Sequence, residues 1–328
     1  MLYRVRPPVL LVTLALLTLL VFGVALAAGS VSLPLHSVWS ALAGHGDPLT
    51  RTLVLELRLP RALNAFAVGA LLAMAGALMQ VLLRNPLADP YILGVSGGAA
   101  VGALGALLAG VGGFWLSGNA FAGALISMLI VFVLAHGRGG WTPTRLLLTG
   151  IVVAFGWGAL ISFMLVMSDD ASLRGMLFWL MGDLSYRGSS GLPLAVVGIG
   201  LLGWLPFARY LNVLARGETL AEALGIAVRP FSIAIYISAS LFTAIAVTEA
   251  GAIGFVGLVI PHILRLLSGS DHRSLLPGAA LAGGSLLMLA DTLARTVVAP
   301  QQLPVGVVTA AIGVPLFLYL LNRARGPL

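Results

Sequence analysis

Residues 63–83 read LNAFAVGALLAMAGALMQVLL, a run of 21 residues without a single charge. A helix that rises about 1.5 Å per residue covers about 31 Å over this run, which matches the ~30 Å hydrocarbon core of a bilayer. The apolar residues are continuous rather than alternating, and this pattern favours a helix over a strand of a β-barrel. The run therefore predicts a membrane-spanning helix.

The composition of the whole chain agrees with this run. Hydrophobic residues make up 59% of the 328 positions, charged residues make up 9%, and the mean hydropathy is +1.06. Soluble domains carry roughly 25% charged residues, so this chain is too apolar to cover a water-exposed surface. We expect an all-α integral membrane protein with one transmembrane domain over residues 1–328.

Nine further apolar segments bring the number of predicted spans to about ten. They cover residues 9–28, 91–111, 119–136, 145–167, 191–208, 230–249, 254–267, 276–294 and 305–322. The first ends near ALAAGS, which resembles a signal-peptidase site, but its length favours a retained helix. The segment 254–267 is short and is expected to be buried among its neighbours. An even number of spans places both termini on one side of the membrane.

Residue types that are missing exclude several classes of protein. The chain has no cysteine, so it forms neither disulfides nor thiolate metal sites. All 18 basic residues are arginine, and without lysine there is neither a P-loop nor a Schiff-base site. The arginines are scattered between spans rather than gathered on one face, which argues against nucleic-acid binding.

The distribution of the arginines predicts the orientation in the membrane. With a cytoplasmic N-terminus, six arginines fall on the outer side, namely Arg51, Arg58, Arg61, Arg174, Arg187 and Arg295. The other twelve fall on the cytoplasmic side, as the positive-inside rule requires. Both termini and the connections 84–90 and 208–230 are then cytoplasmic.

Small residues recur within the second and third spans. Gly69, Ala73 and Ala77 follow one another at four-residue spacing, and glycines are dense from Gly94 to Gly113. Such residues let helix backbones approach closely inside a membrane. The sequence leaves two interpretations open, either tight helix packing or a glycine-rich surface along a wide passage.

The cytoplasmic connection 84–90, RNPLADP, separates two apolar runs with two prolines and two opposite charges. Pro86 and Pro90 prevent one continuous helix, because proline lacks the amide donor and restricts the residue before it. Asn85 can cap the resulting turn, and Leu87 places an apolar side chain at the cytoplasmic mouth. A plain connector between two helices is the alternative.

The connection 208–230 is the longest predicted cytoplasmic loop, and it contains a short helix. Residues 219–222 have the capping-box form, with Thr219 as N-cap and Glu222 reaching back to it. Gly225 can end this helix in the left-handed conformation. Glu218 and Glu222 are expected to be exposed, and the apolar side consists of Leu220, Ala223 and Leu224. Two interpretations of this helix remain open: it is a solvated loop helix, or it fits a groove on a partner.

Three arginines on the predicted outer side are candidates for contact with a partner. Arg58 and Arg61 precede the second span, where cations oppose the helix dipole. This placement suggests an acidic partner that approaches from outside, and snorkelling of both side chains to the interface is the alternative. Arg295 follows Asp291 by one turn, so these two can also form an ion pair within one helix.

Few ionisable residues fall inside the predicted spans, where they would mark an ion path. Glu249 and Asp291 lie near span ends, and His262 follows Pro261 in the short eighth span. An ion-coupled transporter would need such groups, or the carbonyl oxygens of broken helices. A membrane-embedded enzyme would need clustered His, Asp or Glu, whereas the five histidines are dispersed.

Three long stretches carry a resemblance to a known family. They are RLPRALNAFAVGALLAMAGALMQVLLRNPLADPYILGVSGGA at 58–99, GAIGFVGLVIPHILRLLSGSDHRSLLPGAALAGGSLLMLAD at 251–291 and QLPVGVVTAAIGVPLFLYLL at 302–321. In these stretches, and in their order and spacing, the chain resembles the FecCD family, the permease subunits of bacterial ABC importers for ferric siderophores, haem and cobalamin. The resemblance implies the type II ABC importer permease fold in the bacterial inner membrane, without catalytic residues or cofactor.

The resemblance also implies partners. A second copy would form a homodimer around one central passage, two separate ATPase subunits would bind in the cytoplasm, and a periplasmic substrate-binding protein would dock outside. A metal chelate (cobalamin, haem or a ferric siderophore) would cross the lipid bilayer by alternating access. An ion-coupled secondary transporter of a small organic solute is the alternative function.

Particular residues match the functional segments of that family. The helix that couples to the ATPase matches Gly217, Glu218, Thr219, Leu220, Glu222, Leu224 and Gly225. The arginines that meet the binding protein match Arg58, Arg61 and Arg295. The cytoplasmic gate matches Asn85 and Leu87 before the third span, and Thr142 and Pro143 before the fifth. Pro143 departs slightly from the family pattern and would stiffen this second gate.

Overall fold

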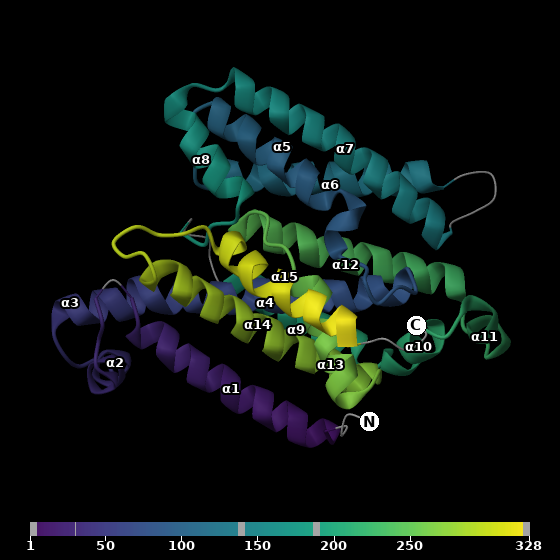
Figure 1. Ribbon diagram of the computed structural model, residues 1–328, viewed down its shortest axis with the longest axis horizontal. Helices are drawn as coiled ribbons and strands as arrows, with labels where there is room; N and C mark the ends of the chain where they lie inside the picture. The colour runs from purple at the N-terminus through teal and green to yellow at the C-terminus, as the bar shows by residue number, and fades with distance from the viewer. Residues whose placement is uncertain (1–4, 30, 137–141, 186–190, 324–328) are drawn as a thin grey trace.

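The computed structural model describes residues 5–29, 31–136, 142–185 and 191–323. Within these ranges the chain is helical and contains no β-strand, so the all-α prediction is confirmed (Figure 1). Four of the arginines counted for the orientation, Arg4, Arg138, Arg187 and Arg325, lie outside the described residues.

The described helices follow the predicted spans, with short helices between them. In chain order they are α1 (Pro7–Ala27), α2 (Leu35–Leu42), α3 (Pro48–Arg51), α4 (Leu59–Leu82), α5 (Val95–Leu108), α6 (Phe114–Ala135), α7 (Pro143–Met167), α8 (Asp170–Leu180), α9 (Gly191–Trp204), α10 (Ala208–Leu214), α11 (Glu218–Ala223), α12 (Val228–Ala250), α13 (Val256–Ser268), α14 (His272–Thr296) and α15 (Val305–Arg323). A π-helix, η1 (Thr52–Arg58), precedes α4, and a 3-10 helix, η2 (Pro90–Leu93), precedes α5.

Each of the ten predicted spans corresponds to helix in the described part of the chain. Six helices are long and apolar enough to cross a bilayer alone, namely Pro7–Ala27, Pro48–Leu82, Phe114–Ala135, Pro143–Met167, Val228–Ala250 and His272–Thr296. The pair α9 and α10 is bent by 72° and forms a seventh candidate, so the sixth predicted span, 191–208, ends at a sharp bend. The shorter apolar helices α5, α13 and α15 account for the remaining three.

The second predicted span begins earlier than its apolar run suggests. The segments α3, η1 and α4 form one continuous helix of 35 residues, Pro48–Leu82. Asp47 caps its start by accepting a hydrogen bond from the backbone N–H of Thr50 at 3.2 Å. Arg58 and Arg61 therefore lie inside a helix, and the expectation that they oppose the dipole at its N-terminus is wrong.

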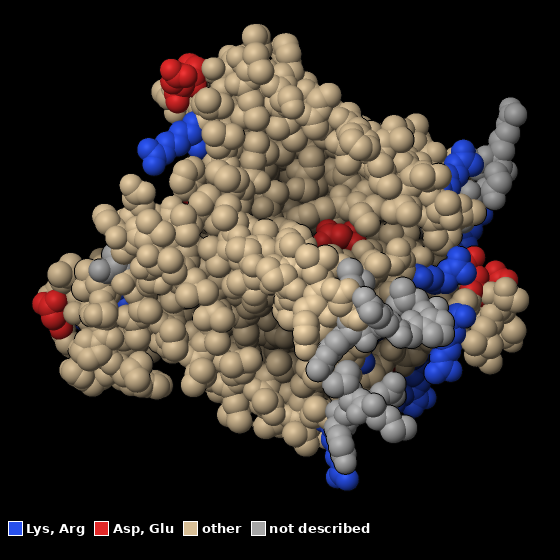
Figure 2. Space-filling view, in the orientation of Figure 1, with Lys and Arg blue, Asp and Glu red and all other residues tan. Residues whose placement is uncertain are grey.

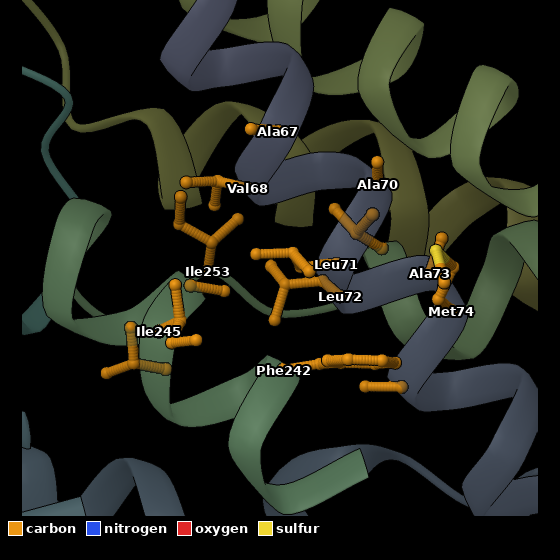
Figure 3. Close-up of a cluster of buried hydrophobic side chains, with 14 of the residues drawn as sticks. Ala67, Val68, Ala70, Leu71, Leu72, Ala73, Met74, Phe242, Ile245 and Ile253 are labelled. Carbon is orange, nitrogen blue, oxygen red and sulfur yellow. The ribbon is translucent and has the colours of Figure 1, made fainter. Parts of the chain in front are cut away.

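The helix α4 is the centre of the bundle, and most of its residues are buried. In the cluster of Figure 3, Leu71 and Leu72 of α4 lie against Phe242 and Ile245 of α12. The helices α13 and α14 cover other sides of α4, and α1 packs on α14. A helix that is apolar all round is stable in this position because protein surrounds it on every side.

Direct backbone contact explains the small residues of α4 and α5. A Cβ added to Gly69 would lie 2.2 Å from the carbonyl oxygen of Gly283 in α14, and one added to Gly76 would lie 1.9 Å from that of Gly257 in α13. In α5, Gly98 faces the backbone of α6 in the same way. Tight helix packing, the first of the two interpretations, is confirmed at these positions.

The two ends of the bundle differ in shape and charge. The start of α1 and the end of α15 lie toward the same end as α10 and α11, while α2 and α3 lie at the opposite end (Figure 1). Arginine side chains gather at the α10–α11 end (Figure 2). The arginine count predicts that this end faces the cytoplasm, so we refer to it as the inner end and to the α2–α3 end as the outer end. The helices α5, α6, α7 and α8 form a separate group beside the α4 bundle.

Candidate functional site

Arg58 fastens the outer end of α1. The residue is only 7% exposed, and its Nη1 donates to the carbonyl oxygens of Leu26 and Ala27, each at 2.8 Å. Its Nη2 donates to the carbonyl oxygen of Val31. The last carbonyl groups of a helix are unsatisfied and partly negative, so a guanidinium is favourable there. The guanidinium of Arg58 is therefore buried against the end of α1 and points away from solvent.

Arg61 and Arg295 share the carboxylate of Asp291. The Nη2 of Arg61 lies 2.8 Å from one carboxylate oxygen, and the Nε of Arg295 lies 3.0 Å from the other. Asp291 is nearly inaccessible, whereas the side chains of Arg61 and Arg295 are 18% and 10% exposed. The predicted ion pair within α14 is confirmed, and Arg61 joins it from α4.

The three predicted docking arginines come together around one pocket of about 400 Å³ at the outer end. Its other polar lining residues are Glu56, Asn64, Ser185 and Gln302. Arg61 also donates to Ser185 and Gln302, each at 3.3 Å. The charged residues that line this pocket are these three arginines and Glu56, so its lining carries excess positive charge.

The connection 84–90 forms a compact turn below α4. The Oδ1 of Asn85 accepts the backbone N–H of Leu87 at 2.9 Å, and the carbonyl oxygen of Asn85 accepts that of Ala88 at 3.1 Å. Asp89 then caps η2, accepting the N–H of Tyr91 at 2.8 Å. Asn85 therefore caps the turn as predicted, and Leu87 is partly exposed beside it.

Thr142 and Pro143 lie at the start of α7. Thr142 is the N-cap, since its Oγ1 accepts the N–H of Arg145 at 3.3 Å, and Pro143 occupies the first turn, where its missing donor costs nothing. A Cβ added to Gly150 of α7 would lie 2.3 Å from the carbonyl oxygen of Ile92 in η2. The helix α7, which begins at Pro143, therefore packs against η2, which begins at the end of the connection 84–90.

Gln80, which sequence analysis did not single out, holds this region together. Its Nε2 lies 3.3 Å from the carbonyl oxygens of Ala88 and Leu258 and 3.4 Å from that of Gly257. Its Oε1 accepts a hydrogen bond from Nη1 of Arg265 in α13. An amide in the last turn of a largely apolar run was the available signal, because such a group needs partners in a membrane.

The short helix predicted in the connection 208–230 is α11, but it begins differently. Gly217, with φ of +135°, is the N-cap, and neither Thr219 nor Glu222 forms the predicted capping-box bond, so that prediction is wrong. At the other end, Gly225 adopts φ of +79° and donates to the carbonyl oxygen of Glu222 at 2.9 Å. Ile226 donates to the carbonyl oxygen of residue 221 at 2.9 Å, which completes a Schellman motif.

The apolar side chains of α11 are largely uncovered. Leu220 and Leu224 are 43% and 62% exposed, while Ala221 is buried against the body of the protein. Glu218 lies 3.2 Å from the guanidinium of Arg84, which links α11 to the end of α4. Two exposed leucines one turn apart at the arginine-rich end form a surface that a partner can cover.

These features describe a multispanning membrane protein, with a small helix held out at the inner end and an arginine-lined pocket at the outer end. Residues 16–323 match the model of the FecCD transport family, and the chain belongs to this family. The predicted resemblance is thereby confirmed over nearly the whole sequence.

Several relatives in this family are named as permeases. The chain is 42% identical over 321 residues to the vitamin B12 import system permease protein BtuC of Escherichia coli, covering 96% of this chain and 95% of that one. It is 43% identical over 337 residues to the cobalamin import system permease protein BtuC of Halobacterium salinarum, covering 96% and 89%. It is 41% identical over 320 residues to the uncharacterised ABC transporter permease protein YvrB of Bacillus subtilis, covering 92% and 90%.

A solved structure supports the same fold. The inward-facing conformation of a metal-chelate type ABC transporter matches this chain with a TM-score of 0.84 and 33% identity, covering 96% of this chain and 99% of that one. The predicted ABC importer permease fold is confirmed, and the protein is an integral membrane protein.

Proposed function

We propose that this chain is the permease subunit of an ATP-driven importer that moves a metal chelate from the periplasm to the cytoplasm. Cobalamin is the first cargo to test, because relatives at 42% and 43% identity are named as vitamin B12 or cobalamin permeases. Haem and ferric siderophores are the other cargoes of this chemical class. The subunit works in the bacterial inner membrane with both termini in the cytoplasm.

The observation that carries this proposal is the exposed apolar side of α11 at the inner end. Leu220 and Leu224 are too exposed to stabilise this chain alone, and they suit a groove on a separate cytoplasmic ATPase. Gly217 and Gly225 delimit the helix, and Glu218 ties it to the loop after α4. Closure of two ATPase subunits around ATP would move α11 and shift the permease between outward-open and inward-open states.

At the outer end, the proposal assigns contact with a substrate-binding protein to Arg61 and Arg295. Both guanidinium groups are partly exposed and share one carboxylate, so they can donate hydrogen bonds to a further carboxylate of a partner. Arg58 supports this surface indirectly, because it is committed to the carbonyl oxygens at the end of α1. The same arrangement in a second copy would place two such surfaces around a central passage.

At the inner end, the proposal gives the gate to the connection 84–90 and the start of α7. Asn85 shapes the turn through its hydrogen bond to Leu87, and Leu87 narrows the passage with an apolar side chain. Thr142 and Pro143 fix where α7 begins on the other side. Opening then requires a change in the relation between this loop and α7 rather than any covalent chemistry.

The test is transport by the whole assembly in proteoliposomes, after co-expression with candidate ATPase and binding-protein subunits from the same genome. ATP hydrolysis and uptake would be followed with cobalamin, haem and a ferric siderophore in turn. The variant Leu220→Asp with Leu224→Asp should lose ATP-driven uptake and co-purification of the ATPase, because two charges enter an apolar contact. Ala227→Asp is the control, since Ala227 is exposed after α11 and is the N-cap of α12, where aspartate is favourable.

Two outcomes would contradict the proposal. Normal ATP-driven uptake by the double variant would mean that the ATPase docks elsewhere. Uptake that follows an ion gradient and ignores ATP would favour the ion-coupled secondary transporter of a small organic solute.

A further inference from the structure

Arg84 occupies a backbone position that normally belongs to glycine. It follows the C-cap of α4 with φ of +48°, and among the described residues only Arg84 and Phe255 combine a side chain with positive φ. Its N–H donates to the carbonyl oxygen of Val81 at 3.1 Å, and the N–H of Asn85 donates to that of Gln80 at 3.2 Å. These two bonds form a Schellman motif, in which the left-handed residue is usually glycine because any Cβ is unfavourable there.

The side chain of Arg84 reaches a different part of the chain. Its Nη2 lies 3.2 Å from Oε1 of Glu218, the first residue of α11. The two side chains are 38% and 40% exposed, and ion pairs with so much solvent around them contribute little net stability. The pair therefore does not offset the unfavourable backbone of Arg84, and stability does not explain an arginine at this position.

The loop that follows Arg84 is held as one unit. Asn85 bonds to Leu87, and Ala88 bonds to Gln80, so a displacement at the start of the loop extends to its end. Gln80 continues the connection to Arg265 in α13. A movement of α11 that pulls on Arg84 can reach the whole of 84–90 through these hydrogen bonds.

We propose that Arg84 and Glu218 are a positioning pair that transmits the movement of α11 to the connection 84–90. This inference rests on the proposed function, in which α11 meets the ATPase and the loop forms part of the gate. A weak, half-exposed ion pair suits this task because it can break and form again in every transport cycle without a large barrier. The left-handed backbone directs the Arg84 side chain away from the axis of α4 and toward α11.

The decisive variant is Arg84→Gly. Glycine keeps the left-handed backbone and relieves its strain, so the thermal stability should be equal or higher and the ATPase should still co-purify. The cargo moved per ATP hydrolysed should nevertheless fall, by about two- to fivefold if a surface ion pair sets the coupling. The exchange Arg84→Glu with Glu218→Arg should restore the ratio, whereas each single exchange should lower it.

The outcomes separate this inference from the proposed function. A wild-type ratio of cargo to ATP in Arg84→Gly, or failure of the double exchange to restore what the single exchanges lose, would overturn the positioning pair and leave the permease function intact. Lack of ATP-driven uptake by the wild-type assembly would overturn the proposed function and the pair together. Lowered coupling with retained ATPase and a restored double exchange would support the pair.

Discussion

Replacing Asp291 with asparagine would remove the only carboxylate that Arg61 and Arg295 contact among the described residues, while keeping the side-chain shape. The wild-type carboxylate is nearly inaccessible and accepts from Nε and Nη2 of Arg61 and from Nε of Arg295, at distances between 2.8 and 3.1 Å. Asparagine offers one acceptor oxygen and turns an amide N–H₂ toward a guanidinium. Two cations would then remain close together without a counter-charge.

The geometry sets the size of this effect. Removal of one partner from a buried ion pair typically costs about 3–5 kcal/mol, because the charge left behind is desolvated. The side chains of Arg61 and Arg295 are 18% and 10% exposed, so water can partly solvate them and the lower end of that range applies. We therefore expect a loss of about 3 kcal/mol, which corresponds to a fall in Tm of roughly 4 °C for a chain of this size.

The assay is thermal unfolding of the purified protein in detergent, with Asp47→Asn as the matched control. Asp47 is an exposed outer carboxylate that caps α3, and asparagine caps a helix equally well, so the control changes the same charge at little cost. Equal Tm values for the two variants would refute the reasoning, since the buried carboxylate would then contribute no more than a surface charge.

Three further predictions concern the gate, the helix packing and the carboxyl group of Asp89. Asn85→Ala with Leu87→Ala should let cargo leak from loaded liposomes without ATP, and unchanged retention would exclude the gate. Gly76→Ala should lower Tm, because its Cβ would lie 1.9 Å from a carbonyl oxygen of α13, whereas Gly105→Ala meets its nearest neighbour at 3.7 Å and should be neutral or stabilising; equal shifts would contradict the close packing. Burial raises the pKa of Asp89 from 3.8 to about 6. Between these pH values the folded protein keeps the proton of this carboxyl group, whereas the unfolded chain loses it. The contribution of Asp89 to wild-type stability therefore falls as the pH rises from 4 to 6. Asp89→Asn should therefore gain Tm over wild type across this window and hold a constant gain above it, and a difference that ignores pH would contradict the shift.

Features that depend on residues close together in the chain could be predicted from the sequence. Apolar runs of about 20 residues predict spans because only a helix satisfies its own backbone in a bilayer. The left-handed end at Gly225 and the pair of Asp291 with Arg295 follow from spacings of one turn. The small residues of the apolar run left close packing of α4 as one of two interpretations, and the structure decided between them.

Errors arose where local signals competed or where the apolar run hid a longer helix. Thr219 and Glu222 have the capping-box form, but Gly217 caps α11, because glycine with positive φ lets the chain enter the helix two residues earlier. Arg58 and Arg61 precede an apolar run and were placed at a helix N-terminus, yet the helix continues back to Pro48 through a π-helical segment.

What only the tertiary structure decided is the partner of each polar group. Arg58 meets carbonyl oxygens at the end of α1, Arg61 meets Asp291 of α14, Gln80 joins α4 to α13, and Arg84 meets Glu218 of α11. The sequence determined that these groups must find partners, since unpaired polar groups are costly in an apolar bundle. It did not determine which partners they find, because that depends on how helices distant in sequence pack against one another, and small residues allow that packing at many positions along α4.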